Sequence, residues 1–157
     1  MEYHNIEPVY DRESRILILG SFPSVKSRQA QFFYHHEQNR FWKVLAHIFT
    51  EELPLTIEEK KTFLHRHHIA LWDVIASCEI KGSSDASIKA VKVNDLDRII
   101  NEAKIHHIYT NGNLSDRYFH QYFHYSLPCT KLPSTSSANA RYSLEQLISF
   151  WQVISEE

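Results

Sequence analysis

The sequence contains little of what marks secreted or membrane proteins. Its 157 residues include two cysteines, Cys78 and Cys129, which lie far apart and form no CxxC spacing. This pattern does not fit a disulfide framework and favours a reducing compartment. No apolar run approaches the length of a membrane-spanning helix, and the first fifteen residues carry no apolar core of signal-peptide length. We therefore expect a soluble, cytoplasmic protein with no membrane partner.

An excess of positive charge is also missing, because the formal net charge is -2 at pH 7. This value argues against a generic basic nucleic-acid binder. The basic residues are unevenly distributed, however. Residues 20–43 hold four Lys or Arg against one acid, and residues 128–141 hold two against none. The two segments indicate either a local surface for an anionic partner or simply a solvated face.

The composition, 43% hydrophobic and 23% charged, is typical of a folded globular chain, and the length suits a single domain over 1–157. Apolar runs rich in β-branched or aromatic residues predict four strands, at 15–20, 69–76, 105–112 and 128–133. The segments between them have helical spacing. This alternation predicts an α/β fold with a mostly parallel sheet and helices on both faces.

Five helices are predicted between and after these strands. Apolar spacing predicts helices over about 39–50 and 114–124. Thr56 with Glu59, and Ser143 with Gln146, have the spacing of capping boxes and predict helices that begin just after Thr56 and Ser143. Asn94 is a candidate cap for a helix in the segment that follows it.

The scarcity of glycine makes two of the three glycines informative. Gly20 and Gly112 directly follow the first and third predicted strands. Ligands of open parallel sheets bind at the carboxyl ends of the strands, where glycine allows close backbone approach. A plain turn explains either glycine alone equally well. The stretch "LPSTSSANA" at 132–140 follows the fourth strand, so three strand ends with small polar residues are expected to form one site.

Two long motifs in these segments resemble those of a known family. "GSFPSVKSRQAQFFYHHEQNRFWKVL" and "LPSTSSANA", together with "YTNGN" after the third strand, are similar to the uracil-DNA glycosylase superfamily, and most similar to its hypoxanthine-DNA glycosylase branch. The resemblance spans about residues 14–154. It implies a three-layer αβα fold with a short four-stranded parallel sheet, and hydrolysis of an N-glycosidic bond in DNA after a damaged base is flipped out. It also implies no metal and no cofactor.

The resemblance assigns roles to individual residues. Asn39 stands where the hypoxanthine branch places the catalytic residue, because Ser21 and Phe22 leave no carboxylate or carboxamide in the first motif. Tyr34 matches the aromatic residue that stacks on the flipped base. The remaining base-pocket residues are Gly20, Ser21, Phe22, Pro23, Asn111 and Asn113. The residues expected to contact DNA are Ser24, Lys26, Arg28, Pro133, Ser134, Thr135, Ser136, Asn139 and Arg141.

Two positions depart from the motifs of relatives. His36 is followed by Glu37 where relatives often have proline, which puts an acid near the predicted pocket, and Ser137 replaces a proline of the last motif. The last motif also lacks a large apolar wedge, which leaves Asn139 or Arg141 to fill the space of the flipped base.

Several residues have a second explanation. Asn39 is also a good cap for a helix starting at Arg40. Asp73, at the end of the second strand, would either bind the base or accept hydrogen bonds from a neighbouring loop. His120 and His124 have helical ligand spacing, but no cysteine or glutamate stands at a recognisable zinc interval, so no metal is predicted.

The predicted function is release of hypoxanthine from deoxyinosine in DNA, by a monomer that acts at the nucleoid without an obligate protein partner. One alternative is a uracil or mismatch-specific glycosylase on the same scaffold. A second alternative is a nucleic-acid-binding module that retains the sheet but not the catalysis.

Overall fold

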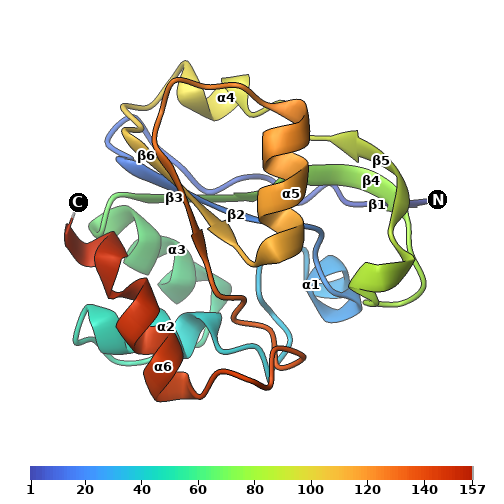
Figure 1. Ribbon diagram of the computed structural model, residues 1–157. Coiled ribbons are helices and arrows are strands. Elements are labelled where there is room, and N and C mark those ends of the chain that lie inside the picture. Colours follow the sequence, from blue (N-terminus) through green and yellow to red (C-terminus); the bar gives the residue numbers. More distant parts are fainter. Residues whose placement is uncertain (157) are drawn as a thin grey trace.

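The centre of the protein is a four-stranded parallel sheet, seen in the computed structural model, which describes residues 1–156 (Figure 1). Its strands follow the order β3-β2-β6-β7. Their bounds are Ile16–Gly20 for β2, Ile69–Asp73 for β3, His107–Asn111 for β6 and Cys129–Leu132 for β7. The predicted parallel sheet is confirmed, and each strand lies within the range expected from its apolar run.

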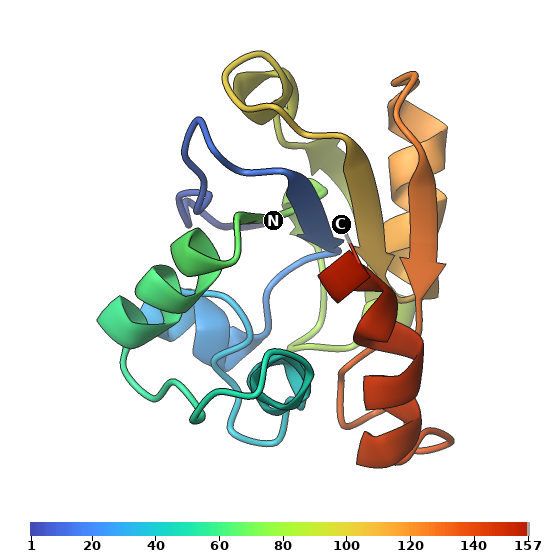
Figure 2. The ribbon, with the colours of Figure 1, turned by 90° about the vertical axis from the view of Figure 1, so that its left-hand side faces the viewer.

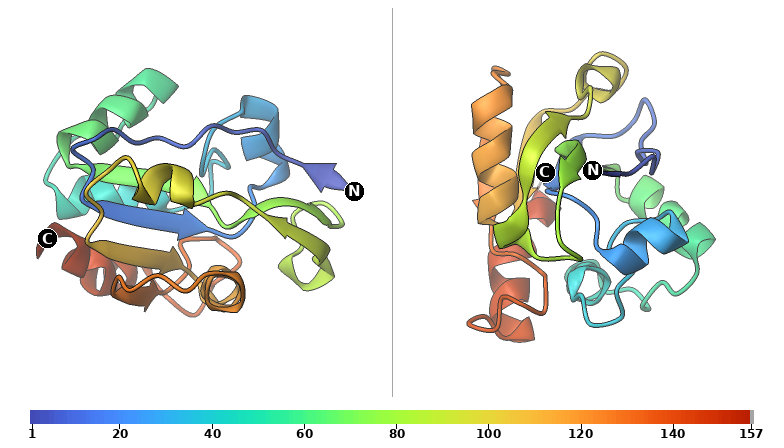
Figure 3. Two further views of the ribbon diagram at one scale, coloured as in Figure 1. Left: turned by 90° about the horizontal axis from the view of Figure 1, so that it is seen from above. Right: turned by 90° about the vertical axis from the view of Figure 1, so that its right-hand side faces the viewer.

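Helices cover both faces of this sheet. In Figures 2 and 3, α5 (Asn113–Tyr122) lies on one side and α3 (Ile57–Arg66) on the other. The remaining helices are α1 (Val25–Ala30), α2 (Phe41–Ile48), α4 (Asp97–Ile100) and α6 (Leu144–Trp151), with short 3-10 turns at Asp85–Ser87 and Gln152–Glu156. No helix within residues 1–156 combines the length and apolar character needed to cross a membrane.

Burial explains why the central strand reads as an unbroken apolar run. All five residues of β2 are buried, because β2 lies between β3 and β6 and helices cover the sheet. Both capping boxes are confirmed: Thr56 accepts from the backbone of Glu59, and Ser143 accepts from that of Gln146. These side chains satisfy backbone donors that would otherwise lack partners at the helix starts.

The sequence did not predict a second sheet. Strands β1 (Glu2–Tyr3), β4 (Ile75–Glu79) and β5 (Lys89–Val93) pair in antiparallel fashion in the order β1-β4-β5. The predicted strand at 69–76 is therefore two strands that meet at Val74. Ile75 N donates to Ser21 O, so the chain stays attached to the first motif as it changes sheets.

The predicted cap at Asn94 is wrong. Helix α4 begins at Asp97, and Asn94 Nδ2 donates instead to Asp73 O at 2.8 Å. This bond joins the end of β5 to the end of β3, and so holds the backbone of a residue at the carboxyl edge of the main sheet. A short-range pattern of polar and apolar residues carries no information on such a contact between distant segments.

Candidate active site

The carboxyl ends of the four parallel strands border one cavity of about 760 Å³. The arrows of β2, β6 and β7 point toward this end of the molecule in Figure 2. The cavity brings together most of the predicted site residues: Gly20, Ser21, Phe22, Pro23, Ser24, Tyr34, Asn39, Asn111, Asn113, Pro133, Ser134, Thr135, Ser136, Asn139 and Arg141. Lys26 and Arg28 do not line it.

Asn39 lies in the cavity wall just before α2. Its Oδ1 accepts hydrogen bonds from Phe41 N and from Thr135 Oγ1, both at 2.9 Å. A backbone N–H can only donate, so the bond from Phe41 identifies the amide oxygen and fixes the orientation of the side chain. Asn39 therefore both caps the first turn of α2 and lies in the cavity wall. Two donors occupy the oxygen, which leaves Nδ2 as the polar atom of Asn39 available to a ligand.

Thr135 connects two walls of the cavity. Besides its bond to Asn39, its Oγ1 accepts from Asn111 Nδ2 and its backbone N donates to Asn111 Oδ1, both at 3.0 Å. Thr135 is fully buried. The enclosed and already hydrogen-bonded hydroxyl does not favour the predicted DNA contact of Thr135. Its position instead aligns Asn39 with Asn111.

Arg40 has a structural role at the site that the sequence did not predict. Its Nη2 donates to Ser136 O and Asn139 O, both at 3.0 Å, and its Nη1 donates to Tyr142 O. The guanidinium thus holds the loop after β7 closed. Arginine at a helix start is unfavourable for the helix dipole. The positive charge at the start of the predicted helix was therefore the one sign in the sequence that the Arg40 side chain binds groups outside the helix.

We predict that Arg40→Lys lowers both stability and base release, because one ammonium cannot reproduce the fork of donors to three carbonyls. Loss of hydrogen bonds from a charged donor costs about 1.5–3 kcal/mol. Thermal unfolding and single-turnover assays measure the two effects. Lys43→Arg, the reverse exchange at an exposed position of α2, serves as the control and should match the wild type. Unchanged stability in Arg40→Lys would contradict the assigned role.

Tyr34 is fixed in the cavity wall by its ring and its backbone. One face of the ring stacks on Phe41, with ring centroids 4.1 Å apart and 19° between planes. The residue has φ of 51°, a left-handed conformation uncommon for a bulky side chain. Its buried hydroxyl lies near the Asn111 amide but has no well-formed hydrogen bond among the described residues. A rigid ring in a cavity wall is suited to stacking on a planar ligand.

Asp73 ends β3 in the same cavity wall and is only 3% exposed. Its Oδ2 has no hydrogen-bond partner within residues 1–156. Burial raises the pKa of Asp73 to about 7. His4 Nε2 lies 3.9 Å from Oδ2, but it is 2.7 Å from the carbonyl oxygen of Ile75 and donates to it, and burial lowers the pKa of His4 to about 4. No charged histidine therefore compensates Asp73 at neutral pH.

Glycine is required at position 20 because a larger side chain would not fit, and not because of the backbone conformation. A Cβ at this position would lie 2.3 Å from Asp73 Oδ1 and 2.8 Å from Tyr34 Oη. Both polar groups therefore converge over the bare Cα of Gly20. Gly112 differs, because its φ of 98° is itself unfavourable for other residues.

Comparison with known proteins identifies the family. The family model of the uracil DNA glycosylase superfamily matches residues 7–155. The chain belongs to the uracil DNA glycosylase superfamily. It is 34% identical, over 86% of its length and 87% of the relative, to a protein of Methanosarcina acetivorans named hypoxanthine DNA glycosylase. A protein of the same name from Methanosarcina barkeri is 31% identical over 96% of both chains.

The fold agrees with this assignment. A solution NMR structure from Methanosarcina acetivorans, described as a uracil DNA glycosylase, matches with a TM-score of 0.83 and 29% identity over 98% of this chain and 97% of the other. The protein is thus a DNA N-glycosylase of this superfamily, with damaged DNA as its substrate. The residue roles in the cavity remain predictions that rest on its geometry.

The basic residues of this glycosylase differ in their freedom to contact DNA. Arg28 Nη2 donates to Gly82 O at 2.9 Å, and its Nη1 lies 3.2 Å from a Glu2 carboxylate oxygen. Its guanidinium also covers the Phe22 ring, 5.1 Å from the centroid. These contacts join α1 to the second sheet, and they do not favour the predicted DNA contact of Arg28. Lys26, Lys131 and Arg141 are exposed.

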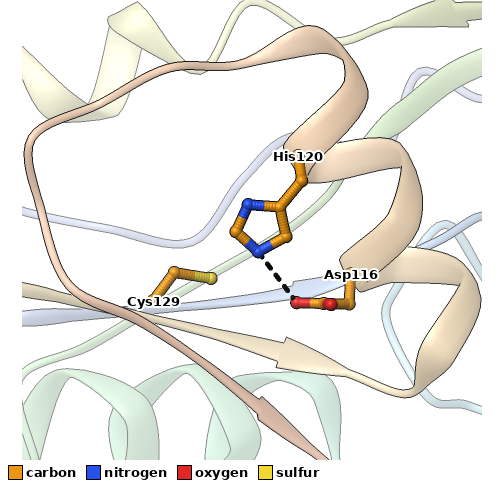
Figure 4. A group of neighbouring side chains, drawn as sticks. All are labelled: Asp116, His120 and Cys129. Carbon is orange, nitrogen blue, oxygen red and sulfur yellow. Dashed lines mark ion pairs between the residues drawn. The ribbon is translucent and has the colours of Figure 1, made fainter.

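A group of potential metal ligands lies outside the glycosylase cavity. Asp116 and His120 of α5 and Cys129 of β7 place one ligand atom each within 4.8 Å of the others (Figure 4). Asp116 Oδ1 already accepts from Thr110 Oγ1 at 2.8 Å and lies 3.2 Å from His120 Nε2. Burial raises the pKa of Cys129 to about 11, which disfavours the thiolate that metals bind. We assign no metal to this group.

We predict that Asp73→Asn stabilises the glycosylase in a pH-dependent way. The ordinary pKa of Asp73 is 3.8 and burial raises it to about 7 in the folded state. The unfolded chain therefore loses this proton first, and wild-type stability falls as pH rises between about 4 and 7. Asparagine does not titrate. The free energy of unfolding of Asp73→Asn should therefore exceed that of the wild type by an amount that grows across this window, reaches at most ~4 kcal/mol, and then levels off. Denaturant unfolding at pH 4 to 8 measures it.

Proposed function

We propose that this glycosylase hydrolyses deoxyinosine in DNA, releasing hypoxanthine and leaving an abasic site. The observation that carries the proposal is the Asn39 amide, held in the cavity wall by Thr135, on the same hydrogen-bond network as Asn111. The first motif loop, with Ser21 and Phe22 at its centre, supplies no acid or amide for this purpose. The names of the two Methanosarcina relatives support the choice of hypoxanthine.

The proposed chemistry breaks the bond between C1′ and N9 through an oxocarbenium-like state. An asparagine oxygen in a cavity wall would ordinarily be the atom to accept a hydrogen bond from the attacking water. Both lone pairs of that oxygen already receive donors, from Phe41 N and Thr135 Oγ1. Nδ2 is therefore the better candidate: it donates to the water oxygen and leaves the second lone pair of the water directed at C1′. Its contribution is orientation rather than proton removal.

The substrate is held by contacts to both base and backbone. The flipped base stacks on the cavity face of Tyr34, whose other face is supported by Phe41. Stacking offsets part of the cost of flipping, which is a few kcal/mol and least for a mispaired base. Asn113, at the first turn of α5, donates to the base as negative charge develops on it. Ser24, Ser134, Ser136, Lys26, Lys131 and Arg141 are the residues proposed to contact phosphates.

The first test is base release from matched duplexes that contain deoxyinosine or deoxyuridine at one position. We expect abasic-site formation with deoxyinosine and little with deoxyuridine. Strong release of uracil with no release of hypoxanthine would replace the proposal with the pyrimidine alternative. Binding of both duplexes without cleavage would favour a module without catalytic activity.

The second test separates the two polar atoms of Asn39. Asn39→Asp keeps an oxygen for the donors at Phe41 and Thr135 but replaces Nδ2 with an acceptor. We expect both Asn39→Asp and Asn39→Ala to lose about 100-fold or more in single-turnover rate. The thermal stability of Asn39→Asp should stay near that of the wild type. Gln38→Glu, the same chemical change at the exposed neighbouring position, is the control. Wild-type activity in Asn39→Asp would show that an acceptor is needed there.

A further inference from the structure

We propose that the carboxyl group of Asp73 is the acid that protonates the departing purine at N7. This role rests on the proposed function and extends it, because it gives the site a preference for purine leaving groups. Pyrimidines have no atom equivalent to N7. Asp73 is then a catalytic residue in contact with the base, whereas Asn39 acts on the water.

The first support is the position of the carboxyl group. Asp73 is the last residue of β3 and lies in the cavity wall at the carboxyl edge of the parallel sheet. Its backbone is fixed at both sides, since Asn94 Nδ2 donates to its carbonyl oxygen and Val74 N donates to Gly20 O. Gly20 leaves open the space that the carboxyl group occupies. The acid is therefore held rigidly where ligands of such sheets bind.

The second support is the absence of a structural partner. Buried carboxylates with structural roles accept hydrogen bonds, commonly from backbone N–H groups or from arginine. Asp73 Oδ2 accepts none from the described residues. The buried hydroxyl of Tyr34 next to it also lacks a well-formed bond. Such unsatisfied polar groups in a cavity wall are explained if a bound ligand supplies the missing partner.

The third support is the geometry of stacking. The Tyr34 ring is held by Phe41, and its hydroxyl end reaches the bare face of Gly20, where Asp73 also lies. A base stacked on the free face of Tyr34 runs parallel to the ring. Asp73, at the end of β3, and Asn111, at the end of β6, line the same cavity, so we place the far edge of the base against these two residues. A purine is long enough to present its five-membered ring or its carbonyl edge there.

Protonation of N7 accompanies cleavage of the glycosidic bond. The electron pair of the C1′–N9 bond moves into the purine, and the Asp73 proton is transferred to N7, so hypoxanthine leaves as a neutral molecule. The water held by Asn39 adds its oxygen to C1′ and releases a proton. A proton from solution returns to the Asp73 carboxylate. The products are free hypoxanthine and an abasic site, and no other reactant is needed.

The surroundings keep the acid protonated near neutral pH. Burial raises the pKa of Asp73 to about 7. The titratable neighbours are His4, whose pKa burial lowers to about 4, and Tyr34, whose pKa is raised by burial and then by Asp73. Arg28 is the charged side chain that acts on His4. Because His4 and Tyr34 remain uncharged between pH 6 and 9, Asp73 is the group of this set that titrates there.

The deciding experiment combines a substitution of Asp73 with a substrate that lacks N7. Wild type and Asp73→Asn are each assayed, under single-turnover conditions, on duplexes containing deoxyinosine or 7-deaza-2′-deoxyinosine, which lacks N7. We expect Asp73→Asn to lower the rate on deoxyinosine about 100-fold or more. On the 7-deaza substrate the two proteins should be about equally slow. Wild-type rates on deoxyinosine should also fall as pH rises above about 7, and this fall should be absent in the variant.

The other outcomes separate the proposals. Equal loss from Asp73→Asn on both substrates would mean that Asp73 does not act through N7, and would overturn this inference while deoxyinosine cleavage by the wild type still supports the proposed function. Failure of the wild type to cleave deoxyinosine would overturn both. A measured rise in the stability of Asp73→Asn would show that the variant is folded. Glu52→Gln, which removes an exposed acid outside the cavity, is the control and should leave the rate and the pH profile unchanged.

Discussion

The hydrogen bonds of Thr135 are the interaction on which the site depends. A single buried hydroxyl accepts from Asn111 and donates to Asn39, which joins the end of β6, the loop after β7 and the start of α2. Arg40 reinforces the junction from the other side by holding the carbonyls of the same loop. Because Asn39 Oδ1 accepts from both Phe41 N and Thr135 Oγ1, the amide of Asn39 is held in one orientation. Preorganisation of this kind is what orientation-based catalysis requires.

Asp73, in the same cavity, lacks the hydrogen bonds that fix Asn39. It is buried without a hydrogen bond to Oδ2 and without a charged partner at neutral pH, so it costs folding stability. Strained or unsatisfied groups persist where function needs them and where the surrounding structure supports them. In the proposed mechanism, the fixed amide at the α2 side orients the water and the unsatisfied acid at the β3 side protonates the base. Tyr34, which lines the same cavity, is the proposed stacking surface.

The second sheet gives this arrangement its rigidity. Strand β4 continues from β3 after Val74, and the pairing of β4 with β1 and β5 holds the end of β3 through Asn94. His4, from the segment after β1, packs beside Asp73 and donates to Ile75 O. Arg28 connects α1 to the same sheet. A residue that was expected to contact DNA therefore supports the structure beneath the cavity.

The sequence by itself determined the parallel sheet, the capping boxes and the family, because apolar runs, cap spacings and contiguous motifs are all local in the chain. It also predicted that the segments after Gly20, Gly112 and Leu132 border one cavity, since the carboxyl ends of parallel strands meet at one edge. Only the tertiary structure decided which atoms of Asn39 are free, that Thr135 is enclosed, that Arg40 closes the loop and that Asp73 lacks a partner. These facts depend on hydrogen bonds between residues about 20 to 100 positions apart. Side chains of one type serve as caps, links or ligands according to the neighbours that folding brings to them.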